Sequence, residues 1–179
     1  KAIAKSTNIT LSYLRTIGNN IRHYLTIKTI TSLLTGILIW AFLEIIGLEF
    51  ALLWGLIAFL LNYIPSIGSI IAAFPAVLFA LVDLNPAGVI WTIIIFATVN
   101  IVIGSFVEPK AMGKGMGLST FVVFAGLIFW GFILGTVGMF LSVPLTMTIK
   151  IILEHNKGTE WIAVLLGTEE DANKVLEET

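Results

Sequence analysis

Residues Phe50–Val82 have the sequence FALLWGLIAFLLNYIPSIGSIIAAFPAVLFALV, a stretch of 33 residues without a charge. A helix needs about 20 residues to cross the hydrocarbon core of a bilayer, so this stretch is too long for one span and too short for two spans with a hydrated loop. The segment Ile64–Ser69 predicts a turn inside it, because Pro65 lacks a backbone donor and Gly68 permits a reversed backbone. Each arm of about 15 residues then reaches about 22 Å, which is shorter than the hydrocarbon core of about 30 Å. We expect a re-entrant helical hairpin, with two strongly tilted short spans as the alternative.

The whole chain has the composition of a membrane protein. It has 179 residues, of which 58% are hydrophobic and 12% charged, with a mean hydropathy of +1.01. Soluble domains contain about 45–50% apolar and about 25% charged residues, so a soluble globule and a disordered chain are both excluded. A net charge of −1 offers no basic surface for nucleic acid. Because the chain does not begin with Met, we interpret it as part of a longer protein.

Three further runs without charge, 29–43, 84–107 and 115–149, extend the membrane domain to residues 29–154. Asn85 followed by Pro86 predicts a helix start, since Asn caps helices and Pro suits the first turn. The run 115–149 is, like 50–82, too long for one span and too short for two spans with a hydrated loop. Gly135–Gly138 predicts a turn inside it. The expected segments are an amphipathic or connecting helix at 1–28, a span at 29–47, a hairpin at 50–82, a span at 87–107, a hairpin at 118–149 and a cytoplasmic tail at 155–179.

Basic residues set the expected orientation. They cluster before residue 29, in the segment Lys110–Lys114, and at Lys150 and Lys157, and cytoplasmic segments carry such an excess. The first span then runs outward and the second inward, so the two hairpins enter from opposite sides. The sequence therefore predicts an all-α polytopic membrane protein built as an inverted repeat of a transmembrane helix plus a re-entrant or short-span hairpin.

The sequence offers no catalytic constellation. Cysteine is absent, which excludes disulfides and thiolate chemistry, and the two histidines, His23 and His155, stand far apart. No nucleophile elbow, phosphate-binding loop or set of metal ligands is present as a motif. We therefore expect neither an enzyme nor a bound cofactor or metal.

Paired broken helices instead indicate transport. Irregular backbone is tolerated in a bilayer only where it is buried in protein or lines a polar cavity, and interrupted segments in matching halves point to a midplane transport site. Asn62 and Asn100 lie inside apolar runs, as parts of a solute path or as hydrogen-bonded contacts between helices. The other polar candidates beside the breaks are Ser66, Ser69 and Thr136.

Glu108 ends the second span, so its depth decides its role. A deep carboxylate is a candidate proton or ion carrier, and a shallow one pairs with Lys110 or Lys114 at the interface. In the second hairpin, Gly131 and Gly135 form a G-x-x-x-G pair that favours close packing or a sliding surface. Trp130 beside them suits a cavity wall or an interfacial belt.

Several motifs occur together in a specific order. They are Asn62-Tyr63-Ile64-Pro65-Ser66-Ile67-Gly68, Glu108-Pro109-Lys110-Ala111-Met112-Gly113, Phe129-Trp130-Gly131, Gly135-Thr136-Val137-Gly138-Met139 and Val143-Pro144-Leu145. Over about Ile21 to Leu166 the chain resembles the autoinducer-2 exporter family of prokaryotic membrane transporters. The resemblance implies a place in the cytoplasmic membrane, further transmembrane helices before this part, homo-oligomers, reported as pentamers, and an elevator-like movement. It also implies export of autoinducer-2 in some members and sodium/proton antiport in others.

The resemblance implies that the transport elements are the tip Pro65–Gly68, Glu108-Pro109 with Gly113, and the region from Trp130 to Gly138. We thus expect a secondary transporter in the lipid bilayer, exporting a small polar solute with proton or sodium coupling, with both tips at a midplane cavity. The alternatives are a sodium/proton antiporter, an oligomeric channel and a non-transporting interaction subunit.

Overall fold

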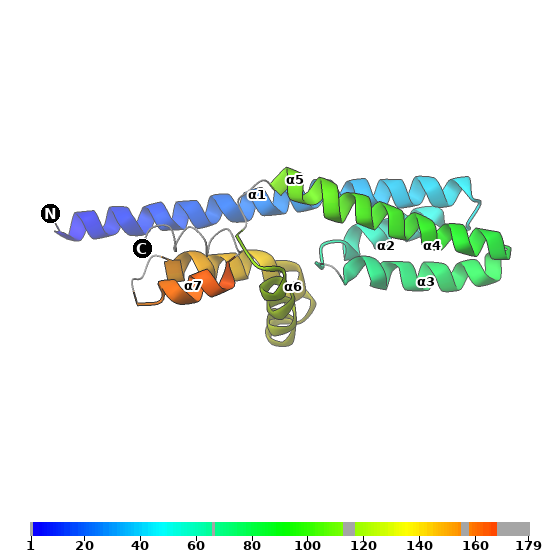
Figure 1. The fold of residues 1–179 in the computed structure, drawn as a ribbon. Coiled ribbons are helices and arrows are strands. Elements are labelled where there is room, and N and C mark those ends of the chain that lie inside the picture. Colours follow the sequence, from blue (N-terminus) through cyan, green and yellow to red (C-terminus); the bar gives the residue numbers. More distant parts are fainter. Residues whose placement is uncertain (1, 66, 113–116, 155–157, 168–179) are drawn as a thin grey trace. The chain divides into compact units, whose positions relative to one another are not determined.

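The structure is a computed structural model that describes residues 2–65, 67–112, 117–154 and 158–167. All regular structure in these ranges is helical, which confirms the predicted all-α class (Figure 1). The elements are α1 (Ala2–Ile45), α2 (Ala51–Leu61), α3 (Gly68–Asp83), α4 (Pro86–Ile101), the π-helix η1 (Val102–Val107), α5 (Glu108–Met112), α6 (Thr120–Glu154) and α7 (Glu160–Leu166).

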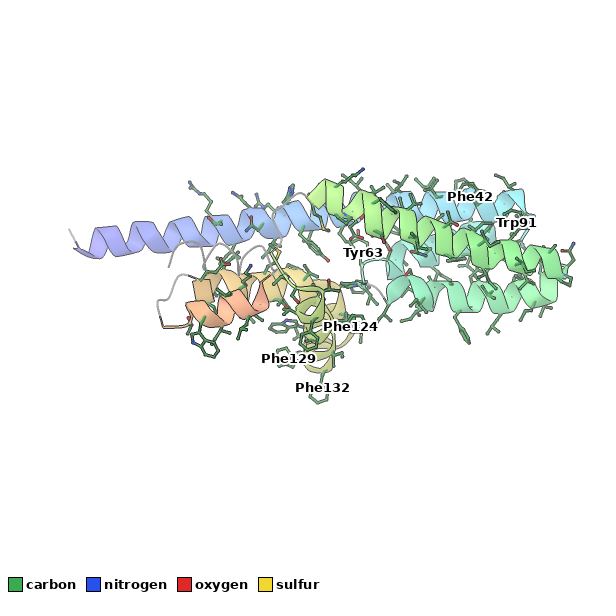
Figure 2. The ribbon with its side chains drawn as sticks, in the orientation of Figure 1. Phe42, Tyr63, Trp91, Phe124, Phe129 and Phe132 are labelled. Atoms are coloured by element: carbon green, nitrogen blue, oxygen red, sulfur yellow. The ribbon has the colours of Figure 1, made fainter. Side chains whose placement is uncertain are left out.

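Helix lengths and surfaces match a polytopic membrane protein. Within the part of the chain that the structure describes, three helical segments are long and apolar enough to cross a membrane: Arg15–Ile45, Pro86–Met112 and Thr120–Glu154. Large apolar side chains are exposed along the helices, among them Trp91 at 56% and Phe132 at 91% (Figure 2). Such exposure is unfavourable in water and normal in lipid. The predicted polytopic membrane protein is therefore confirmed.

The chain divides into two compact units. The central unit comprises Ile27–Gly113, and the terminal unit comprises Lys1–Thr26 and Lys114–Thr179. Helix α1 is continuous from Ala2 to Ile45, so the helix expected at 1–28 and the span expected from residue 29 form one element. Charged residues are absent after Lys28 as far as residue 43, but no proline or glycine near Lys28 ends the helix there.

The core of the central unit joins α1, α2, α3 and α4. Small residues allow the helices to approach closely: Ala72, Ala76 and Ala80 form a buried row at intervals of four on α3. Gly36 of α1 and Gly55 of α2 face one another, since a Cβ built on either would lie within 2.8 Å of the carbonyl oxygen of the other. These contacts set α2 directly against α1.

The predicted turn of the first hairpin is present, between α2 and α3. Its backbone is closed by hydrogen bonds from Ile64 N–H to the Leu61 carbonyl, 2.9 Å, and from Gly68 N–H to the Ile64 carbonyl, 3.2 Å. Our expected reason for Gly68 was wrong, because its backbone φ is not positive. Glycine is needed there for space: a Cβ at Gly68 would lie 1.8 Å from the Leu61 carbonyl oxygen.

The opposite end of the central unit contains Glu49 and Asp83. Asp83 accepts a hydrogen bond from the backbone N–H of Glu49, 2.8 Å, and so ties the end of α3 to the start of the hairpin. The predicted helix start at Asn85 is confirmed, since its side chain accepts from Gly88 N–H, 2.9 Å, with Pro86 as the first helical residue.

In the terminal unit, α6 folds back on itself at Gly135. This residue has φ 64° and ψ −145°, a conformation essentially restricted to glycine. The two arms then pack closely: a Cβ at Gly126 would lie 2.7 Å from Thr146 Oγ1, and one at Gly131 would lie 3.0 Å from the Met139 side chain. The predicted break and the predicted close approach of the arms are both present.

Candidate functional site

A buried ion pair joins the two ends of the central unit's sequence. Lys28 Nζ of α1 contacts Glu108 Oε1 at the start of α5, and the two side chains are 5% and 16% exposed. Taking both charges out of water costs several kcal/mol per ion, which their mutual attraction and hydrogen bonding must offset. The pair is therefore sensitive to anything that neutralises either partner.

Lys28 lies on the polar face of α1. The buried face of this helix carries Thr31, Ser32 and Thr35 after Lys28, followed by Gly36, at helical spacing. The two threonine hydroxyls bond within the helix, since Thr31 donates to the Lys28 carbonyl at 3.2 Å and Thr35 to the Thr31 carbonyl at 2.9 Å. The face is thus polar and small while the opposite face is apolar.

The tip of the first hairpin binds this same part of α1. Asn62 Nδ2 donates to Ser32 Oγ at 3.0 Å, and Tyr63 Oη donates to Thr29 Oγ1 at 2.8 Å. The ion pair and the tip therefore meet at one end of the central unit. We call this set, Lys28, Thr29, Ser32, Asn62, Tyr63 and Glu108, the polar end cluster.

The polar end cluster lies away from the contact between Gly36 and Gly55. The contact between Gly36 and Gly55 occupies the middle of the apolar run, and the tip lies one to two turns nearer to Lys28. The contacts of α2 and the turn after it with α1 thus extend from Trp40 back to Thr29.

The structure places the other candidates of the central unit separately. Asn100 donates from Nδ2 to the Phe96 carbonyl of its own helix at 2.7 Å, and Ser69 lies half-buried in the first turn of α3. Pro65 is half-buried at the tip, and Pro109 is exposed beside Glu108. Ser66 and Gly113 lie outside the described residues. The Glu108 carboxylate pairs with Lys28 and not with Lys110, which is exposed; Lys114, the other partner considered for a shallow Glu108, lies outside the described residues.

The candidates of the terminal unit surround the turn of α6. Trp130 donates from Nε1 to Thr146 Oγ1 at 3.1 Å and so links the arms. Gly138 repeats the geometry of Gly68, because a Cβ there would lie 1.9 Å from the Trp130 carbonyl oxygen. Thr136 is exposed at the turn itself.

The sequence analysis missed the residues on α1 that complete the cluster. Lys28, Thr29 and Ser32 were treated as the boundary and the first residues of a span. Their signal is helical spacing: a lysine followed by hydroxyl residues three, four and seven positions later marks one polar face on an apolar helix. A polar face on a spanning helix must meet polar groups from other helices.

The cluster combines a charge pair with neutral polar groups. The Glu108 carboxylate is held by Lys28, and carboxylate oxygens in general accept hydrogen bonds and attract cations. Hydroxyl and amide groups beside it can bind polar oxygens of a solute. Among the described residues, no three His, Cys, Asp or Glu side chains gather as a metal-binding group.

Comparison with known proteins gives one consistent result. The family model for the AI-2E family transporter matches residues 1–158. The chain is 48% identical over 156 residues to the AI-2 transport protein TqsA of Escherichia coli, covering 87% of this chain and 44% of that protein. It is 54% identical over 149 residues to a putative transport protein of Haemophilus influenzae, covering 83% and 42%.

A third relative is the putative transport protein YhhT of Escherichia coli, 47% identical over 147 residues, with 82% of this chain and 42% of that protein covered. The chain therefore spans less than half the length of these relatives. Both hairpins and the polar end cluster fall within the residues matched by the family model.

Proposed function

The chain belongs to the AI-2E family of transporters, and from this we propose that it is part of a secondary transporter rather than an enzyme. The solute is small and polar and moves out of the cell, in an elevator-like movement coupled to protons or sodium ions. The name of TqsA, an AI-2 transport protein, supports a solute of that kind. A homo-oligomer in the bacterial cytoplasmic membrane is part of the same proposal.

One observation carries the ion coupling, the buried contact between Lys28 and Glu108. Ionisable groups within membrane proteins are costly and mark ion or substrate pathways. Neutralising Glu108 with a bound cation removes the attraction that holds it to α1, next to the hairpin tip bound through Asn62 and Tyr63. Cation binding thereby loosens the contact between α1, the tip and the helical segment that carries Glu108.

A second candidate function is sodium/proton antiport, which the same ion pair favours. The carboxylate can alternate between lysine, proton and sodium without any organic solute. The two candidates share Glu108 and differ in whether solute flux is required. Continuous pore conduction and a non-transporting role remain as outcomes of the test.

The test uses the full-length protein in liposomes. Imposed proton and sodium gradients are combined with autoinducer-2, and solute flux and internal pH are measured for the unmodified protein, Glu108→Gln and Glu44→Gln. Glu44 is an exposed carboxylate elsewhere on α1 and serves as the matched control. We expect Glu108→Gln alone to abolish the gradient-driven part of the flux.

Each other outcome has a defined meaning. Sodium-driven pH change without solute flux supports antiport. Electrical currents that persist without a gradient of an exchange partner support a channel. Equal, gradient-driven flux in Glu108→Gln and the unmodified protein removes Glu108 from the mechanism.

A further inference from the structure

The helical segment Pro86–Met112 contains a wide turn just before Glu108. Residues Val102–Val107 form the π-helix η1 between α4 and α5, and the Glu108 N–H donates to the carbonyl of Ile103, five residues earlier. A π-turn absorbs one extra residue in an α-helix and is often found at functional sites. Here it lies immediately before the carboxylate that contacts Lys28.

The wide turn decides which way Glu108 faces. Val99 is 4% exposed and marks the buried face of α4. Glu108 follows nine residues later, which at about 100° per residue is about two and a half turns and puts it on the opposite face of an uninterrupted α-helix. With one residue absorbed by the π-turn, Glu108 instead lies about 80° from Val99, where it can reach the interior.

Pro109 supplies a physical reason for the wide turn. In an α-helix its nitrogen would donate to the Ser105 carbonyl, but proline has no N–H and its ring collides with the carbonyl four residues before it. Widening the preceding turn moves the Ser105 carbonyl away from the ring. Gly104, in the middle of η1, has open space where a Cβ would stand, so no packed side chain opposes this backbone.

We propose that Pro109 is a positioning residue that holds η1 in the π form and thereby directs Glu108 to Lys28. A change of η1 to α-helix turns Glu108 by about 100° away from Lys28 and brings Val107 to its place. Only the consequence for transport rests on the proposed function. The register itself is a property of the helix and can be measured separately.

Cross-linking tests the register without transport. In the full-length protein, with any other cysteine replaced by serine, Lys28→Cys is combined with Glu108→Cys or with Val107→Cys and treated with a short bifunctional thiol reagent. With Pro109 present, we expect the pair at 28 and 108 to cross-link faster. In Pro109→Ala the order reverses, and the same preference in both backgrounds would overturn the proposal.

Pro109→Ser, which also restores the donor, replaces Pro109→Ala if that variant is not monodisperse in detergent. Transport supplies the second measurement. Pro109→Ala should lose flux to the level of Glu108→Gln, and moving the carboxylate by one residue, Val107→Glu with Glu108→Val, should restore it only in the Pro109→Ala background. A merely structural proline would not be rescued in this way. If Glu108 proves dispensable for transport, the cross-linking result still decides the register.

Discussion

The two hairpins close their arms in the same way but hold their tips differently. In both, a glycine at the start of the second arm lies against a carbonyl of the first arm: Gly68 against Leu61 and Gly138 against Trp130, with Cβ distances of 1.8 and 1.9 Å. Each second arm also contains a proline, Pro75 in α3 and Pro144 in α6. The closure is thus shared by the two halves.

The tips differ in what they contact. The first turn is polar and bonds to α1 through Asn62 and Tyr63, beside the Lys28–Glu108 pair. In the second, Leu134 and Val137 are 47% and 59% exposed, and the polar link between the arms, from Trp130 to Thr146, lies away from the turn. Backbone closure and tip attachment are therefore separate properties, and they can be changed one at a time.

The largest expected effect comes from removing the charge beside the first tip. Lys28→Met leaves Glu108 buried without its partner, which costs about 3–5 kcal/mol of unfolding free energy. Replacing both residues by Met removes the buried charge altogether and should recover most of that loss. Denaturant unfolding of the full-length protein in micelles measures this, with the exposed Lys110→Met as control. Equal losses of unfolding free energy in Lys28→Met and Lys110→Met would mean that the Lys28–Glu108 pair does not stabilise this end of the central unit.

The shared closure predicts a matched pair of glycine effects. Gly68→Ala and Gly138→Ala each force a Cβ into a backbone carbonyl, and overpacking of this kind costs about 1–3 kcal/mol or more. Gly18→Ala is the control, because nothing lies within 4 Å of its Cβ position in α1. Thermal unfolding of the three variants in micelles measures the effect. A loss at only one of Gly68 and Gly138 would break the likeness between the hairpins.

The helices and both turns could be predicted from the sequence because they depend on local rules. These rules involve only residues close together in the sequence. They are the length of each run without charge, the missing backbone donor of Pro65 and the helix cap at Asn85. Gly135 was expected at a turn for its conformational freedom, and its φ of 64° agrees. For Gly68 the position was right, but the reason depended on a carbonyl seven residues away.

The polar end cluster could not be predicted in the same way. Lys28 and Glu108 are 80 residues apart, and pairing them requires knowing which helices lie together. Local charge proximity favoured Lys110 or Lys114 as the partner, yet Glu108 and Lys110 lie two residues apart on α5 and therefore do not face one another. Helix register and the choice of neighbouring helices are properties of the packed unit. The sequence of the apolar runs indicates neither.

A smaller effect should distinguish the polar groups of the two tips. Asn62→Ala removes the hydrogen bond to Ser32 and leaves a buried hydroxyl with one partner fewer, a loss of about 1 kcal/mol. Thr136→Ala changes an exposed residue and should stay within about 0.5 kcal/mol. Denaturant midpoints measured side by side test the difference. Equal losses would show that the second tip is held as firmly as the first.

The smallest effect on stability is expected at a second ion pair, Lys150–Glu154, which is more exposed than Lys28–Glu108. Lys150 in the terminal unit pairs with Glu154 at 3.4 Å, yet Glu154 is 43% exposed, and Lys150 also donates to the Gly117 carbonyl. Removing the carboxylate leaves the lysine with that carbonyl, so Glu154→Gln should cost only about 0.3–0.5 kcal/mol. Glu108→Gln, measured in the same unfolding assay, leaves Lys28 buried without a charged partner and should cost several times more. Similar losses of unfolding free energy in the two variants would mean that burial does not make the Lys28–Glu108 pair more important to stability than the Lys150–Glu154 pair.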